Sequence, residues 1–212
     1  MGRDIRRQWK VLERWCPMVF LFAGTLLVGY ATFNGIHAFT GIEYESAENV
    51  FGPGGFALGF LGLLGLYPAL RDRSPKLARV GAICAVLGAV AFSVFVVANL
   101  GEIAGLISPD PPAWAVVFLA MAAIGMISGY LTFAVAVVRS DVHSRMLGLL
   151  LLVPLAIFAT MLTTSRVGFF PQELAFAISS GQALAYLAIG YILRTGRTRT
   201  EREIPSNDVI VS

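Results

Sequence analysis

Six long apolar runs dominate the chain, and short charged segments separate them. None of the runs contains Lys or Arg, and they cover residues 17–38, 50–70, 80–107, 113–138, 146–164 and 171–193. A hydrocarbon core about 30 Å thick needs about 20 consecutive apolar residues in a helix. In lipid every backbone polar group must be satisfied within the protein, so runs of this length are helices and not strands. The pattern predicts an all-α, polytopic membrane protein with six transmembrane helices arranged as three hairpins.

The composition points to the same class. Hydrophobic residues make up 57% of the chain and charged residues 14%, and the mean hydropathy is +0.74. These values lie outside the range of ordinary soluble domains. We therefore expect a basic N-terminal segment over residues 1–16, one transmembrane domain over 17–194, and a disordered polar tail over 195–212.

The charged residues predict the orientation of the helices. Fifteen of the sixteen Lys and Arg residues fall in the N-terminal segment, in the second-to-third and fourth-to-fifth connections, and in the tail. Such segments stay in the cytoplasm. The other connections are acidic, and Arg166 is their only basic residue. We expect a multi-pass protein of the cell membrane with both termini cytoplasmic, so the pI of 9.1 reflects topology and not binding to nucleic acid.

The basic N-terminal segment has three interpretations. A cleaved signal peptide disagrees with the length of the apolar run that follows and with the lack of an Ala-x-Ala-like site after it. Residues 5–15 could form an amphipathic helix in the membrane interface, with Trp9 and Trp15 near the headgroups. The third interpretation, an uncleaved first helix with a positively charged anchor, is the simplest.

Polar residues recur near the outer ends of the first, third and fifth predicted helices. They form pairs three residues apart: Asn34 and His37, Asn99 and Glu102, Thr163 and Arg166. This spacing places both members of a pair on one helical face. Polar groups in membrane segments usually face a protein interior or a water-filled cavity. The pairs therefore either converge in an outward-facing ligand pocket, in which Glu102 pairs with Arg166 and His37 completes the site, or simply emerge among solvated headgroups.

The second helix has a face of small residues formed by Gly55, Gly59, Gly62 and Gly65. Small residues at spacings of three and four let helices approach closely in a membrane, so we expect helix packing here. The alternative is that the preceding Gly-Pro-Gly-Gly entry is unwound, as in the broken helices of transporters.

Other polar side chains line up on the later helices. They are Ser128 and Thr132, Thr160 and Thr164, and Ser179, Gln182 and Tyr186. Hydrogen bonds between helices explain these sets without a ligand. Gln182 stands out because an amide in the middle of a membrane needs several partners.

Catalytic and metal-binding chemistry finds no support in the sequence. Residues 125–129 lack the G-x-S-x-G spacing of a nucleophile elbow. The two histidines, His37 and His143, belong to opposite sides of the membrane, which argues against haem ligation. Cys16 and Cys84 show no metal-ligand spacing and are expected to be small packing residues. We expect no catalytic residue, no metal and no cofactor.

Two functions of different kinds remain. The first is binding or transport of a small molecule or ion through the outward-facing polar cluster. The second is a non-catalytic accessory or assembly subunit of a membrane complex. The expected surroundings are the lipid bilayer and, in the second case, a membrane protein partner or a further copy of the chain.

Overall fold

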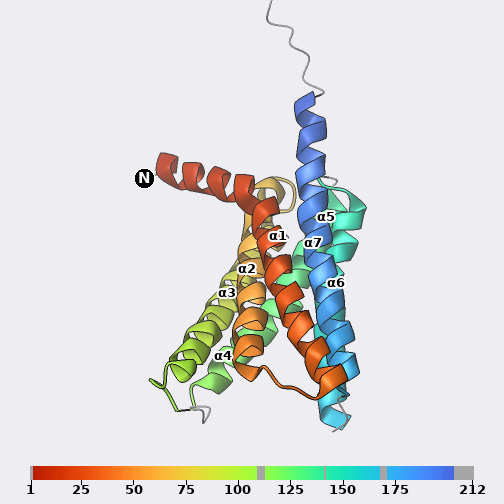
Figure 1. Cartoon of the computed structure of the whole chain (residues 1–212). Coiled ribbons are helices and arrows are strands. Elements are labelled where there is room, and N and C mark those ends of the chain that lie inside the picture. Colours follow the sequence, from red (N-terminus) through yellow and green to blue (C-terminus); the bar gives the residue numbers. More distant parts are fainter. Residues whose placement is uncertain (1, 109–112, 141, 168–170, 203–212) are drawn as a thin grey trace, which may run out of the picture.

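The computed structural model describes residues 2–108, 113–140, 142–167 and 171–202, with side chains given for 9–108, 113–140, 142–163 and 171–196. This part of the chain is helical: α1 (Gly2–Thr40), α2 (Glu45–Arg71), α3 (Pro75–Ile103), α4 (Ala115–Ile124), the π-helix η1 (Gly125–Gly129), α5 (Tyr130–Ser140), α6 (Arg145–Val167) and α7 (Gln172–Arg202) (Figure 1). Since α4, η1 and α5 form one span, the described residues contain six helices long and apolar enough to cross a membrane. The predicted all-α fold with six such helices is confirmed.

The helices differ from the apolar runs mainly at their ends. α3 stops at Ile103, although the apolar run continues to residue 107. Gly105 has a φ of 69°, and the N–H of Leu106 donates to the carbonyl of Gly101 at 2.8 Å. A glycine in the left-handed conformation with this bond closes a helix. Hydropathy does not register this stop, because the residues of the turn are as apolar as the helix before it.

The first and last helices extend beyond the predicted spans. α1 starts at Gly2, and Figure 1 shows its first part lying across the end of the bundle before the helix turns down along it. Pro17 lies inside α1, and a proline disrupts the helical hydrogen-bond ladder. Whether residues 5–15 lie in a membrane interface stays a prediction. α7 continues to Arg202, and the rest of the expected tail, residues 203–212, lies outside the described residues.

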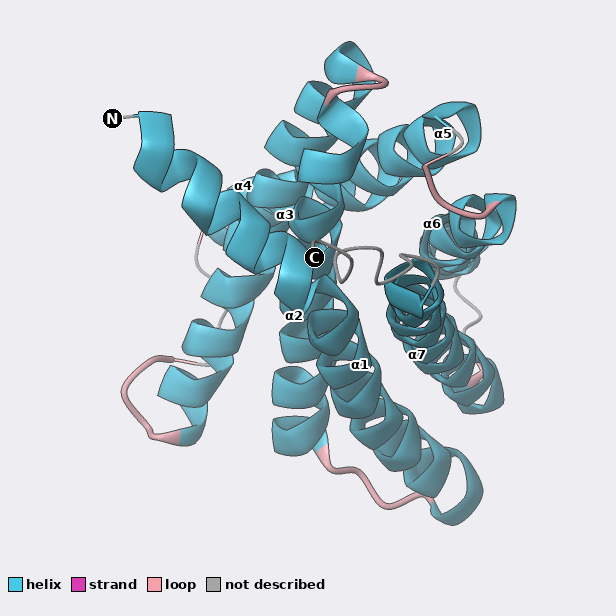
Figure 2. Cartoon of the chain, turned by 90° about the horizontal axis from the view of Figure 1, so that it is seen from above, coloured by secondary structure: helices cyan, strands magenta, loops and turns pink. Residues whose placement is uncertain are grey.

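Each helix packs against its neighbours in the order α1, α2, α3, the α4–α5 span, α6, α7, and back to α1 (Figure 2). The most extensive contact joins α1 to α7, which are the first and last helices of the sequence, whereas α6 and α7 contact each other much less. Of the three predicted hairpins, α1–α2 and α3 with the α4–α5 span pack extensively, whereas the α6–α7 hairpin packs least. We call the region where α1 packs against α2 and α7 the seam.

The two ends of the bundle differ in charge. The basic end holds the 71–75 and 140–145 connections, with Arg71, Arg73, Lys76, Arg139 and Arg145. The acidic end holds the 40–45, 103–115 and 167–172 connections, with Glu43, Glu45, Glu102 and Glu173. The N-terminal part of α1 and the C-terminal part of α7 both lie at the basic end (Figure 1).

Glycines of α2 let the seam close tightly. A Cβ on Gly55 would lie 2.6 Å from Cγ of Leu27, and one on Gly62 would lie 2.8 Å from the ring of Phe20. A Cβ on Gly65 would lie 2.7 Å from Cβ of Cys16, whose Sγ donates to the carbonyl of Gly62 at 3.2 Å. Side chains of α1 therefore occupy the space that larger residues on α2 would fill.

Candidate functional site

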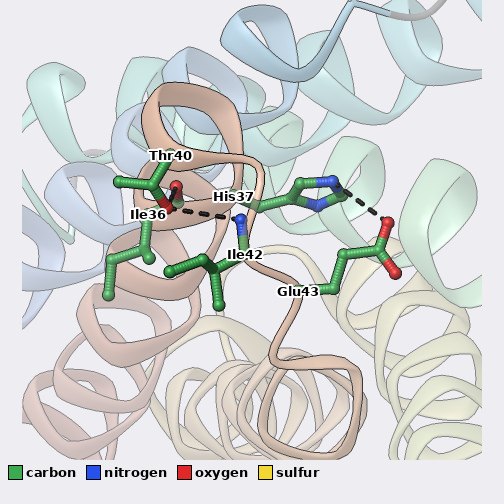
Figure 3. Close-up of polar contacts among 5 residues, drawn as sticks. All are labelled: Ile36, His37, Thr40, Ile42 and Glu43. Atoms are coloured by element: carbon green, nitrogen blue, oxygen red, sulfur yellow. Dashed lines mark hydrogen bonds and ion pairs between the residues drawn. The ribbon is translucent and has the colours of Figure 1, made fainter.

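His37 lies in the last turn of α1 and contacts the connection that follows it. Its Nε2 is 3.2 Å from Oε1 of Glu43 (Figure 3). The hydroxyl of Thr40 donates to the carbonyl of Ile36 at 2.7 Å and accepts the N–H of Ile42 at 3.3 Å. These bonds fold the connection back over the helix end, which brings Glu43 to His37.

Asn34 lies one turn deeper and is buried in the seam, with 4% of its surface exposed. Its Nδ2 donates to the carbonyl of Tyr30 at 2.9 Å. The side chain of Tyr30 in turn approaches Glu48, which also interacts electrostatically with His37. Asn34 and His37 therefore share their surroundings with the first turns of α2.

Asn99 and Glu102 lie on the other side of these turns. They line a hollow of about 180 Å³ together with Glu45, Ser46, Asn49 and Ile103. The Nδ2 of Asn99 donates to the carbonyl of Asn49. The start of α2 thus lies near both of the first two predicted pairs: Asn99 donates to Asn49, and Glu48 lies within electrostatic range of His37.

The third predicted pair lies on α6. Thr163 is exposed, and its hydroxyl donates to the carbonyls of Ala159 and Thr160 at 3.1 and 2.9 Å. The side chain of Arg166 lies outside the described residues, so its pairing with Glu102 stays a prediction. α6 packs against α5 and α7, not closely against α1 or α3. The described residues therefore gather the first two pairs around α2 and leave Thr163 apart from them.

A second polar group occupies the centre of the bundle. Tyr130 and Tyr186 are both fully buried, and their hydroxyls form a hydrogen bond with each other. Gln182 lies one turn from Tyr186 along α7 and is 1% exposed. Its amide lies beside the Tyr186 hydroxyl, yet its oxygen and nitrogen make no hydrogen bond of normal geometry to the described residues. We call these three residues the central cluster.

Aromatic rings and a glycine surround the central cluster. Phe20 meets Tyr186 edge to face, with the ring centroids 5.8 Å apart, and Phe60 meets Tyr130 in the same way at 5.4 Å. A Cβ on Gly59 would overlap the Tyr186 ring. Four spans, those of α1, α2, α5 and α7, thus supply the walls.

Sequence reasoning recognised Gln182 and Tyr186 but missed Tyr130. Tyr130 directly follows η1, and a π-helical turn contains an extra residue that rotates what comes after it. Gly125 of η1 lies against α3 so closely that a Cβ would be 2.7 Å from Cα of Gly88. The regular helical period therefore does not predict the direction in which Tyr130 points. In the sequence, only Gly88 and Gly125 indicate the close helix approach at this turn.

A cavity of about 580 Å³ opens at the basic end. Its polar lining includes Glu13, His143 and Ser144, and its apolar lining includes Leu66, Leu147 and Leu193. Such a size and mixture are typical of small-molecule sites.

The cavity lies between the central cluster and the basic end, along α2. Gly65 lines the cavity and Gly59 contacts Tyr186, so about 9 Å of helix separates them at 1.5 Å per residue. Phe20 and Ile189, both fully buried in the hydrophobic core, are part of the apolar packing of the seam. The cavity therefore ends about two turns short of the central cluster.

A third hollow is apolar and faces sideways. It measures about 620 Å³ and is lined by α2, α3 and the segment before α4, with Leu61, Val90, Val97 and Trp114 among its residues. Its lining suits a lipid chain or an apolar helix and offers almost no polar group.

No group of three or more His, Cys, Asp or Glu side chains that could hold a metal ion occurs among the described residues. Comparison of the chain with models of known families, with characterised proteins and with solved structures found no match.

Proposed function

We propose that this membrane protein binds a small polar solute, preferentially a cation, and carries it across the membrane along the seam. The basic end faces the cytoplasm by the positive-inside rule, so the acidic end is the entrance. Glu43, Glu45, Glu48 and Glu102 surround that entrance. Grouped charges of one sign raise the local concentration of oppositely charged solutes.

The observation that carries this proposal is the distribution of buried polar side chains. Among the residues described, the buried polar ones are Asn34, Ser140, Ser179 and Gln182. Asn34 is on α1, and Ser179 and Gln182 are on α7, so three of the four lie on the two helices that pack together in the seam. Polar residues within membrane segments are costly and tend to mark solute paths.

The seam also has the asymmetry that a transporter needs in one of its states. At the basic end, the 580 Å³ cavity reaches Cys16 and Gly65 on the seam. From the cavity toward the acidic end, the next side chains are those of Phe20 and the central cluster, and all of them are buried. This arrangement supports a state that is open at the basic end and closed toward the acidic end, with the opposite state reached by movement of the helices about the central site.

Flux through reconstituted protein tests the proposal. Proteoliposomes containing the whole chain are given a membrane potential, and uptake of sodium, potassium, ammonium, methylammonium and guanidinium is measured. We expect uptake of at least one of these cations above that of protein-free vesicles. Glu48→Gln should reduce that uptake by about tenfold, because it removes a carboxylate from the entrance.

The matched control is Glu173→Gln, which removes an exposed carboxylate at the acidic end, on α7, without touching the residues around the start of α2. Its uptake should fall much less than that of Glu48→Gln, because Glu173 lies apart from the four carboxylates around the start of α2. Absence of flux for every cation, or equal loss in both variants, would contradict the proposal.

The predicted pairing of Glu102 with Arg166 has its own test. Glu102→Gln and Arg166→Gln are measured separately and together for folded yield and for uptake. A coupled pair gives a double variant no worse than the single ones, and strictly additive effects would show that the two side chains are independent.

The second candidate function is that of an accessory subunit, and the sideways apolar groove favours it. Trp114 and Val97 would contact a transmembrane helix of a partner seated there. Replacing Val90 with Trp would fill the groove. Under this function the substitution releases the partner and leaves cation uptake unaffected, whereas a groove occupied by lipid leaves the composition of the purified complex unchanged.

A further inference from the structure

The central cluster has hydrogen-bonding capacity that the described residues do not use. Each tyrosine hydroxyl can donate once and accept twice, and a glutamine amide adds one acceptor oxygen and two N–H donors. The bond between the hydroxyls of Tyr130 and Tyr186 uses a single donor, and neither polar atom of Gln182 has a partner of normal geometry among the described residues. Buried polar groups left in this condition are unfavourable, so the cluster is suited to a further polar species.

The surroundings limit what that species can be. The rings of Phe20 and Phe60 flank the tyrosines, and the Tyr186 ring lies on Gly59 without a gap. This packing restricts the species to a compact one. Aromatic rings attract cations within about 6 Å, and the phenol and amide oxygens accept N–H donors.

We propose that Tyr130, Tyr186 and Gln182 form a binding position for a compact amine-type cation, of the class of ammonium and methylammonium, in the middle of the membrane. Gly59, against which Tyr186 packs, lies near the midpoint of α2 (Glu45–Arg71). The position is thus separated from both ends of the bundle. It rests on the proposed transport function and names the solute class and the residues that hold it.

The seam differs on the two sides of this position. Ser179 and Asn34 provide buried polar groups between the central cluster and the acidic end. On the other side, about two helical turns of apolar packing separate the cluster from the cavity at the basic end. Release of a cation from the centre toward the basic end would then require Phe20 and its neighbours to move apart.

The experiment compares Gln182→Leu and Tyr186→Phe with Tyr191→Phe. Tyr191 lies on the same helix, is 65% exposed and is outside the cluster, so it controls for loss of a hydroxyl. Purified full-length protein is heated in methylammonium chloride or in sodium chloride at equal ionic strength. Uptake of labelled methylammonium into proteoliposomes is then measured under a potassium diffusion potential, because a potential drives the cation and not the neutral amine.

We expect methylammonium to raise the unfolding midpoint of the unmodified protein and of Tyr191→Phe above the value in sodium. Gln182→Leu should abolish this rise while folding at least as well in sodium, since it removes an unpaired buried amide. Its uptake should fall by about tenfold or more, the usual cost of a lost hydrogen bond to a charged group. Tyr186→Phe should lower uptake in the same direction.

Several results would overturn the proposal. If Gln182→Leu fails to fold, unchanged uptake and an unchanged methylammonium effect in Tyr186→Phe are sufficient to reject it. If both variants fold and behave like Tyr191→Phe, the solute is not held here. If the unmodified protein carries other cations but not methylammonium, this inference is wrong and the transport function stands, whereas failure of every cation rejects both.

Discussion

The helices of the seam are less apolar and more buried than α3 and α6, which expose their outer faces. In α2, 56% of the most apolar stretch is buried, against 28% in α3 and 22% in α6. Yet α3 and α6 are the two most apolar of the six spans. In water the most apolar helix would be the most buried, but lipid solvates apolar side chains as well as a protein core does. High hydropathy here therefore indicates contact with lipid, and lower hydropathy indicates the interior.

The lower hydropathy of the seam comes from the residues that pack it. α2 contributes glycines, and α7 contributes Ser179, Gln182 and Tyr186. Small residues permit close approach of the helices, and the glycines and polar side chains together lower the mean hydropathy of these spans. The most buried spans are therefore α1, α2 and α7, which make up half of the bundle, and four substitutions test that conclusion.

The largest effect is expected for Phe20→Ala. Phe20 is fully buried and fills the space above Gly62, so its removal leaves a cavity worth about 3–5 kcal/mol of unfolding free energy. The control is Phe22→Ala, two residues away on the same helix and 58% exposed, which should change that free energy by less than about 0.5 kcal/mol. Equilibrium unfolding in mixed micelles measures both. Equal losses would mean that the seam is no better packed than the lipid-facing surface.

Gly59→Ala should have the next largest effect. The added methyl group would overlap the Tyr186 ring, and overpacking of this kind costs about 1–3 kcal/mol. Gly181→Ala on α7 is the matched control, because its nearest neighbour is Cδ1 of Ile157 at an ordinary 3.6 Å. The same unfolding measurement compares them. If the Gly59→Ala protein were as stable as Gly181→Ala, close approach of α2 and α7 would not be needed for stability.

A smaller change is expected for Tyr130→Phe. It removes one hydroxyl of the central pair, and the net contribution of such a bond is about 1 kcal/mol. Tyr191→Phe, on the lipid-facing surface, should leave stability unchanged. Thermal unfolding in detergent measures the difference. A Tyr130→Phe protein that is more stable than the unmodified one would show that the hydroxyl destabilises the folded protein.

The smallest effect should follow Glu43→Gln at the acidic end. The carboxylate of Glu43 is 67% exposed, and its contact with His37 is therefore solvated. Exposed ion pairs contribute about 0–1 kcal/mol, so we expect a shift at the lower limit of that range. Unfolding at two salt concentrations provides the test, because a solvated pair weakens further in salt and a buried one does not.

The apolar runs were sufficient to predict the number and approximate extent of the helices. They could not predict the end of α3, since the left-handed Gly105 lies within a sequence that is apolar on both sides. Nor could they predict that α1 packs against α7 at least as extensively as against α2, because hydropathy carries no information on which distant helices meet.

The candidate site was predicted in part. A spacing of three predicts that Asn34 and His37 share one side of α1, but it does not show that both they and the pair Asn99 and Glu102 lie near the start of α2. The burial of Tyr130 could not be predicted from a regular helical period, because η1 changes the helical register immediately before it. The first difference arises from the packing of separate helices and the second from a π-helical turn within one span, and a regular helical period predicts neither.

The proposed transport requires that the seam become hydrated and admit a cation from the acidic end. A protein with Cys16→Ser and Cys84→Ala provides a background for single cysteines at Ser179, 3% exposed on the seam, and at Leu184, 66% exposed toward lipid. The measurement is the rate of modification by a membrane-impermeant cationic thiosulfonate added from the acidic side. We expect Ser179→Cys to react much faster than Leu184→Cys, and we expect methylammonium to slow the reaction of Ser179→Cys. Equal and negligible rates at the two positions would contradict it.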